Sequence, residues 1–210
     1  MKLTIIDDWS NIPSILKESC TKERILDSAT AIMLEHGFHA VGINALLASV
    51  NIPKGSFYHW FQSKEHLGCE MIRHYSESEN AYIQKTLEDT NSHKNPADRI
   101  ISLLQAIITK FKENGYKCPC LLLKLSGEIS NFSERMRDEL AKSLKDTTRL
   151  FKAALDEAIQ QGFLNQNLDT SLEAEFILDY WTGSLHRSTM NRDDKSLHTA
   201  IALFQQRMSS

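Results

Sequence analysis

Residues 43–61 read INALLASVNIPKGSFYHWF, and this stretch decides the fold. Its apolar residues between 43 and 50 recur at i, i+3, i+4 and i+7, the spacing of one helical face. Pro53 then favours the opening of a second, short helix over residues 54–61. Two short helices joined by a tight turn form a helix-turn-helix, whose second helix enters the DNA major groove. Many helical hairpins bind nothing, so spacing alone predicts a plain hairpin equally well.

The sequence around this stretch is helical as well. It holds only eight Gly and four Pro in 210 residues, and this sparse punctuation favours long helices over a turn-rich β fold. Apolar periodicity, caps and breakers predict an all-α fold with eight or nine helices. We expect them over residues 22–36, 43–50, 54–61, 64–87, 96–114, 119–130, 133–161, 171–189 and 194–206.

Composition places the chain among ordinary globular proteins. It is 41% hydrophobic and 24% charged, and it is long enough to bury a core without disulfides. It has no run of eighteen apolar residues, so we expect no membrane span. Asp7 and Asp8 stand where a signal peptide needs a basic flank and an apolar run. The four cysteines do not form a disulfide scaffold, and a reduced cytoplasmic location is expected.

Charge first argues against a nucleic-acid partner. The chain carries a net charge of −3, whereas phosphate binding needs cations. The distribution changes this reading, because no acidic residue lies between Glu35 and Glu65, while Lys54 and Lys64 do. The gap coincides with the predicted helix-turn-helix, whose surface is therefore locally cationic. The overall acidity predicts weak non-specific DNA binding and dependence on a dimer for adequate affinity.

The residues of this segment resemble a known family. Gly37-Phe38, the run INALL from residue 43, and the run VNIPKGSFYHWFQSKE from residue 50 resemble the TetR family of bacterial repressors. The resemblance implies a three-helix DNA-binding domain over residues 21–66 and a ligand-binding and dimerisation domain over 67–210. Residues 1–20 would be an N-terminal extension, beyond the usual start of the family, whose role the sequence does not indicate.

The resemblance also assigns roles within the helix-turn-helix. Phe57, Trp60 and Phe61 fall on one helical face and are expected to anchor the second helix, while the opposite side faces DNA. The bare Gly55 would let backbone approach phosphate closely. Relatives commonly have a Thr or Ser phosphate contact where this chain has Val41-Gly42. The predicted DNA-binding residues are Gly42, Asn44, Lys54, Gly55, Ser56, Tyr58, His59 and Lys64.

The C-terminal part is expected to sense a signal and to dimerise. In this family the last helices build the dimer interface, which implies residues 171–189 and 194–206 here. The implied partners are a pseudo-palindromic double-stranded DNA operator, a second copy of the chain, and a small-molecule inducer or electrophile. We expect no cofactor, no membrane partner and no catalytic residue. Helical register suggests Leu104, Phe111, Trp181 and His186 as pocket residues.

The sequence Cys118-Pro119-Cys120 is the second informative motif. Pro119 fits the first position of a helix, which would place Cys118 at the N-cap and Cys120 at the second helical position. A helix N-terminus and the nearby Lys124 would favour the thiolate. Residues 120–129 also resemble the NemR-like branch, whose members sense electrophiles and oxidants through cysteine. Cys120 is thus the sensor candidate, although a purely structural cysteine fits the pattern equally well.

Other classes of protein remain as alternatives. Cys118 and Cys120 could bind a metal with a distant histidine, and His66, Cys69 and His74 lie near one helix face. Neither group offers four ligands at a familiar zinc spacing. The chain lacks the nucleophile-elbow, P-loop, zinc-protease and dinucleotide motifs, so we expect no enzyme. A helical adaptor or a metal-responsive regulator is the alternative to a ligand- or redox-responsive repressor.

Overall fold

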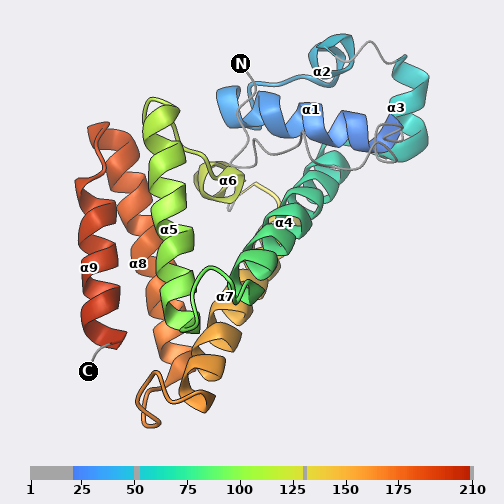
Figure 1. Cartoon of the computed structure of the whole chain (residues 1–210). Helices are drawn as coiled ribbons and strands as arrows, with labels where there is room; N and C mark the ends of the chain where they lie inside the picture. The colour runs from blue at the N-terminus through green and yellow to red at the C-terminus, as the bar shows by residue number, and fades with distance from the viewer. Residues whose placement is uncertain (1–20, 50–52, 130–131, 209–210) are drawn as a thin grey trace. The chain divides into compact units, whose positions relative to one another are not determined.

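The computed structural model describes residues 21–49, 53–129 and 132–208, and it confirms the all-α fold (Figure 1). No strand occurs within these ranges, and none of their helices is long and apolar enough to cross a bilayer. The helices of the described part are α1 (Thr21–His36), α2 (Ile43–Ser49), α3 (Lys54–Trp60), α4 (Lys64–Glu88), α5 (Pro96–Glu113), α6 (Leu121–Ile129), α7 (Glu134–Gln160), α8 (Thr170–Asn191) and α9 (Lys195–Met208).

Local capping chemistry sets several helix ends. Gly37 adopts a φ of +85° directly after α1, the left-handed conformation that ends many helices and favours glycine. The N-cap of α8 is Asp169. The Asp169 carboxylate accepts hydrogen bonds from the backbone N–H groups of Ser171 and Leu172, at 3.0 and 3.1 Å. The carboxylate satisfies these amides and also interacts favourably with the helix dipole.

Two compact units make up the chain, and the first, unit 1, contains the helix-turn-helix. It consists of the residues up to Glu77 together with Pro119–Ser143. Its core therefore combines α1, α2 and α3 with the first part of α4, with α6 and with the start of α7. This unit is larger than the predicted segment 21–66, because α6 comes from a distant part of the sequence to complete its core.

Unit 2 consists of Ser78–Cys118 and Leu144–Ser210. It holds α5, α8, α9 and the remaining parts of α4 and α7. The side chain of Arg99 is only 1% exposed and donates to the Leu87 carbonyl at the end of α4 and to Glu157 of α7. A buried guanidinium needs such partners, so Arg99 links three helices of this unit.

Candidate nucleic-acid interface

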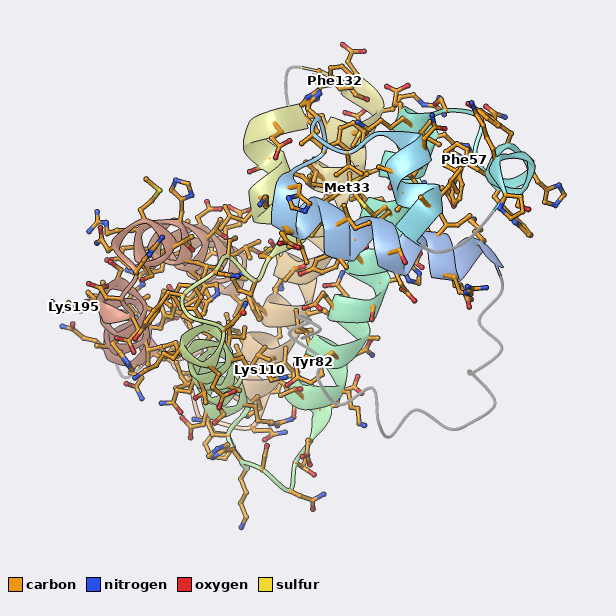
Figure 2. The ribbon with its side chains drawn as sticks, turned by 90° about the horizontal axis from the view of Figure 1, so that it is seen from above. Met33, Phe57, Tyr82, Lys110, Phe132 and Lys195 are labelled. Atoms are coloured by element: carbon orange, nitrogen blue, oxygen red, sulfur yellow. The ribbon has the colours of Figure 1, made fainter. Side chains whose placement is uncertain are left out.

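Helix α3 is held in unit 1 by two aromatic side chains. Phe57 and Phe61 are fully buried, and their ring centroids lie 5.3 Å apart (Phe57 is labelled in Figure 2). Removing a buried Phe side chain costs about 3–5 kcal/mol, so these two rings fix the helix firmly. The anchoring expected from the sequence is confirmed for both residues.

Trp60 does not anchor α3, contrary to expectation. Its side chain is 37% exposed and its indole meets the ring of His59, with centroids 4.7 Å apart. The helix ends at Trp60, and Phe61 is extended, with φ −130° and ψ +120°. Phe57 and Phe61 are buried, so the short helix buries only a narrow stripe and Trp60 lies at its rim.

The opposite side of α3 faces solvent. Lys54, Gly55, Tyr58 and His59 are exposed, and Tyr58 shows 52% of its surface. Ser56 is half-buried. Tyr58 and His59 are thus exposed, although the edge of the Tyr58 ring contacts the Phe57 ring, with centroids 5.2 Å apart. This face therefore offers a cation, a phenol and an imidazole to a partner.

Two glycines of the predicted interface have open space beside them. A Cβ added to Gly42 or Gly55 would meet no atom within 4 Å, and neither residue has a positive φ. Packing and backbone conformation of the free protein therefore do not require glycine at either position. Both glycines and Asn44 are exposed, which leaves room for close approach of a partner's backbone.

Lys64, at the start of α4, packs against an aromatic ring of its own unit, unit 1. Its Nζ is 4.6 Å from the centroid of the Phe38 ring, a cation–π contact. Burial lowers the pKa of Lys64, and the nearby carboxylate of Glu128 partly opposes this. The phosphate contact implied for Lys64 stays a prediction.

Acidic groups next to the helix-turn-helix are engaged by cations. Glu70 accepts from Lys22 at 2.6 Å and from Arg73. Burial raises the pKa of Glu70, but hydrogen bonds and charges from these two residues outweigh it and lower the pKa overall. Asp27 lies 2.9 Å from the ring Nε2 of His74. These pairs neutralise carboxylates of α1 and α4 in unit 1.

The sensor candidate Cys120 lies at a different helical position from the one predicted. Helix α6 begins at Leu121, and the Cys120 carbonyl accepts its first helical bond, from the Lys124 amide at 3.1 Å. Cys120 is therefore at the N-cap, and Cys118 lies outside the helix. The Lys124 ammonium donates to the Glu35 carbonyl at 3.0 Å, so its charge lies at the C-terminal end of α1. The Cys120 side chain is half-buried against the core of unit 1.

The metal-site reading of α4 finds no support in the geometry. The Cys69 side chain is buried, and burial together with Glu139 raises the pKa of its thiol, the opposite of what a metal-binding thiolate needs. His66 accepts from the Gln62 amide through Nδ1, and His74 pairs with Asp27. In the described ranges no three potential metal ligands gather.

The suggested pocket residues of unit 2 differ in their surroundings. Leu104, Phe111 and Trp181 are buried, whereas His186 is exposed and does not belong to that interior. A surface hollow of about 320 Å³ lies on α8 and α9 instead, and none of the four residues lines it.

Tyr82 of α4 and Lys110 of α5, both labelled in Figure 2, form a cation–π pair at 5.6 Å.

The apolar residues of α8 and α9, the helices implied for the dimer interface, fall into two groups. Leu172 and Tyr180 of α8 are 59% and 36% exposed, and Phe176 is half-buried. The others face the interior of unit 2: Ile177, Trp181, Leu197, Ile201 and Phe204. The exposed group leaves an aromatic and aliphatic surface on α8.

The sequence did not predict one tertiary contact between α6 and the end of α1. The Glu128 carboxylate of α6 accepts from the Phe38 amide at 2.8 Å, ninety positions earlier in the chain. No local pattern signals such a contact, because only the packing of α6 on α1 brings the two segments together.

Comparison with known proteins agrees with this architecture. The family model for bacterial regulatory proteins of the tetR family matches residues 25–68, and that for the tetracyclin repressor-like C-terminal domain matches residues 96–204. The HTH-type transcriptional repressor NemR of Escherichia coli K12 is 32% identical over 187 residues, which cover 88% of this chain and 92% of NemR. The repressor DhaR of Mycobacterium sp. GP1 is 27% identical, with 84% and 86% covered.

Solved structures lead to the same result. The crystal structure of E. coli NemR in its reduced form matches with a TM-score of 0.83 and 28% identity, covering 89% of this chain and 95% of that one. A TetR regulatory protein from Rhodobacter sphaeroides shares the fold, with a TM-score of 0.78. Both family models and the relative NemR cover most of the sequence, so this chain belongs to the TetR family of bacterial transcriptional regulators.

Proposed function

We propose that this protein is a homodimeric repressor that binds a pseudo-palindromic DNA operator through α2 and α3. A small molecule, or modification of Cys120, would release it. The observation that carries the proposal is the two-sided build of α3. Phe57 and Phe61 anchor it, while Lys54, Tyr58 and His59 remain exposed on its other side.

The exposed groups suit the two tasks of a recognition helix. The Lys54 ammonium can donate to phosphate, which positions the protein on the duplex. Tyr58 and His59 can hydrogen-bond base edges in the major groove. Gly55 leaves space for a phosphate to approach the start of the helix. Because one short helix reads few bases, two copies on adjacent half-sites supply the affinity and the register.

Dimerisation through α8 and α9 fits the surface of unit 2. Leu172 and Tyr180 expose apolar area that a second copy would cover. Both repressors named above belong to the same family as this chain and match along most of its length. The symmetric dimer then presents two α3 helices to the two halves of the operator.

A thiol signal is supported by the position of Cys120. The residue is half-buried at the start of α6, and it contacts the core of the unit that carries the helix-turn-helix. A group attached there would change that packing. The matching E. coli NemR structure is that of a reduced form.

A gel shift with the DNA upstream of the protein's own gene tests the proposal. Lys54→Ala should weaken binding to all sequences and reduce the salt slope by about one, because one phosphate contact is lost. Lys142→Ala removes the same charge from an exposed position of α7 and serves as the matched control. A wild-type protein that shifts no DNA, or a Lys54→Ala protein that binds like wild type, would overturn the assignment.

A further inference from the structure

We propose that α6 holds the helix-turn-helix in its DNA-binding position through Glu128 and Lys124, which act as positioning residues. This inference rests on the proposed repressor function. The two residues join α6 to the end of α1 and to the segment that leads into α2. We call these contacts the α6 clamp.

The first part of the α6 clamp is the Glu128 carboxylate. One of its oxygens, Oε2, accepts from the Phe38 amide at 2.8 Å and lies 3.4 Å from the His39 amide. The His39 ring Nε2 also lies 3.4 Å from the backbone carbonyl oxygen of Glu128. Hydrogen bonds to a charged group are stronger than neutral ones, so this carboxylate fixes the backbone directly after α1.

The second part is the Lys124 ammonium, which donates to the Glu35 carbonyl at 3.0 Å. That carbonyl belongs to the last turn of α1, where helix carbonyls lack an internal partner and the dipole favours a cation. Lys124 and Glu128 are one turn apart and share a face of α6. The same face of α6 therefore binds the end of α1 just before Gly37 and the backbone just after Gly37.

Gly37 supplies a second, independent observation. A Cβ at this residue would lie 2.4 Å from Oε1 of Glu128, which is closer than Cβ atoms approach other atoms in proteins. Its φ is +85° as well. Glycine therefore meets two needs here, the left-handed turn and the close approach of the Glu128 carboxylate.

Helix α6 cannot shift without moving the core of unit 1. Leu121, Leu125 and Ile129 are fully buried in the cluster that also holds Met33 and Phe57, both labelled in Figure 2. Cys120, at the start of the helix, packs against the same cluster. Because a packed core does not deform continuously, a bulky group at that end displaces α6 as a body and pulls on the clamp.

The clamp thus couples the start of α6 to the orientation of α2 and α3. Such coupling is a free energy shared between two sites, so removing the connecting residue removes the dependence of one site on the other. Breaking the clamp should weaken operator binding and free residues 37–42. It should also abolish the response to a change at Cys120.

A double-mutant cycle between Cys120→Phe and Glu128→Ala tests this coupling. The Phe ring mimics a bulky adduct without requiring a reactive thiol. Each single variant should weaken operator affinity about tenfold and speed amide exchange of residues 37–42. The double variant should be no worse than the poorer single one, since residues coupled through one shared network are non-additive. Glu128→Gln keeps an acceptor oxygen and should lie in between, while Glu134→Ala, an exposed control, should match wild type.

The glycines offer a second arm with a built-in control. Gly37→Ala and Gly162→Ala both force alanine into a positive φ, at +85° and +79°. Only the Cβ at Gly37 meets a neighbour, the Glu128 carboxylate. Gly37→Ala should therefore reproduce the faster exchange of residues 37–42, and Gly162→Ala should not. In a Glu128→Ala background, Gly37→Ala should keep only the cost of its positive φ, so its effect there should be smaller than in the wild type.

Two results would overturn the clamp. One is a Glu128→Ala protein with wild-type amide exchange in residues 37–42 and wild-type operator affinity. The other is strict additivity with Cys120→Phe. If the wild-type protein bound no operator, the proposed function would fail, and the exchange measurements alone would still decide whether α6 is coupled to this segment.

Discussion

Replacing Gly55 by Ala should raise stability and weaken DNA binding at the same time. The residue lies in the first turn of α3, its φ is not positive, and an added Cβ would meet nothing within 4 Å. Glycine in a helix costs about 0.5–1 kcal/mol relative to alanine. The variant should therefore be more stable by about that amount, which corresponds to a rise in Tm of about 1–4 °C for a chain of this length.

The effect on DNA should have the opposite sign. The new methyl group occupies the open space beside Gly55, which we assign to an approaching phosphate. Losing one hydrogen bond to a charged group costs about 1.5–3 kcal/mol, which corresponds to roughly a tenfold to hundredfold weaker operator complex.

Thermal unfolding and fluorescence anisotropy with labelled operator measure the two quantities. Gly127→Ala is the matched control, because this exposed glycine of α6 also has open space around its Cβ and no positive φ. It should stabilise the protein similarly and leave DNA affinity unchanged. A Gly55→Ala protein with wild-type affinity, or one that loses stability, would refute the reasoning.

Three further outcomes follow from single contacts. N-ethylmaleimide should weaken operator binding by the wild type but not by Cys120→Ser; equal effects on both would exclude this thiol as the sensor. His74 has a raised pKa, mainly through its hydrogen bond with Asp27, so its stabilising effect is complete below about pH 6.5 and lost as pH rises through the higher folded-state pKa. His74→Gln should flatten this slope in urea unfolding between pH 6 and 9, and an unchanged slope would contradict it. Glu173 is only 1% exposed and receives three hydrogen-bond contacts from Arg207. Arg207→Ala should cost about 2–4 kcal/mol in urea unfolding at fixed protein concentration, and adding Glu173→Gln should recover part of it because the buried charge disappears; no recovery would count against this reading.

Local patterns were sufficient to predict the helices and the helix-turn-helix. Apolar spacing and the breakers Gly37 and Pro53 act over three or four residues, the same range as helical hydrogen bonds. The exposure of Tyr58 and His59 followed from the same periodicity. The prediction for Trp60 failed within a single helical turn. Trp60, the last residue of α3, is exposed although the spacing of the rings puts it on the anchoring face.

The start of α6 shows the same limit. Pro119 fits the first position of a helix, but in the structure the N-cap is Cys120, so Pro119 precedes the cap. A proline signals a helix start only to within a residue or two, because helix ends depend on their surroundings as well. That small shift moves Cys120 to the N-cap and leaves Cys118 outside the helix.

The sequence by itself determined the helices, the anchoring Phe57 and Phe61, and the acid-free surface of the helix-turn-helix, because these features depend on neighbours a few residues apart. Only the tertiary structure decided that α6 belongs to the unit that carries them. It alone brought Glu128 to the Phe38 amide across ninety positions and made Gly37 the residue that permits the contact. The physical reason is that such contacts require several helices to pack at once, and no short-range period encodes how they pack.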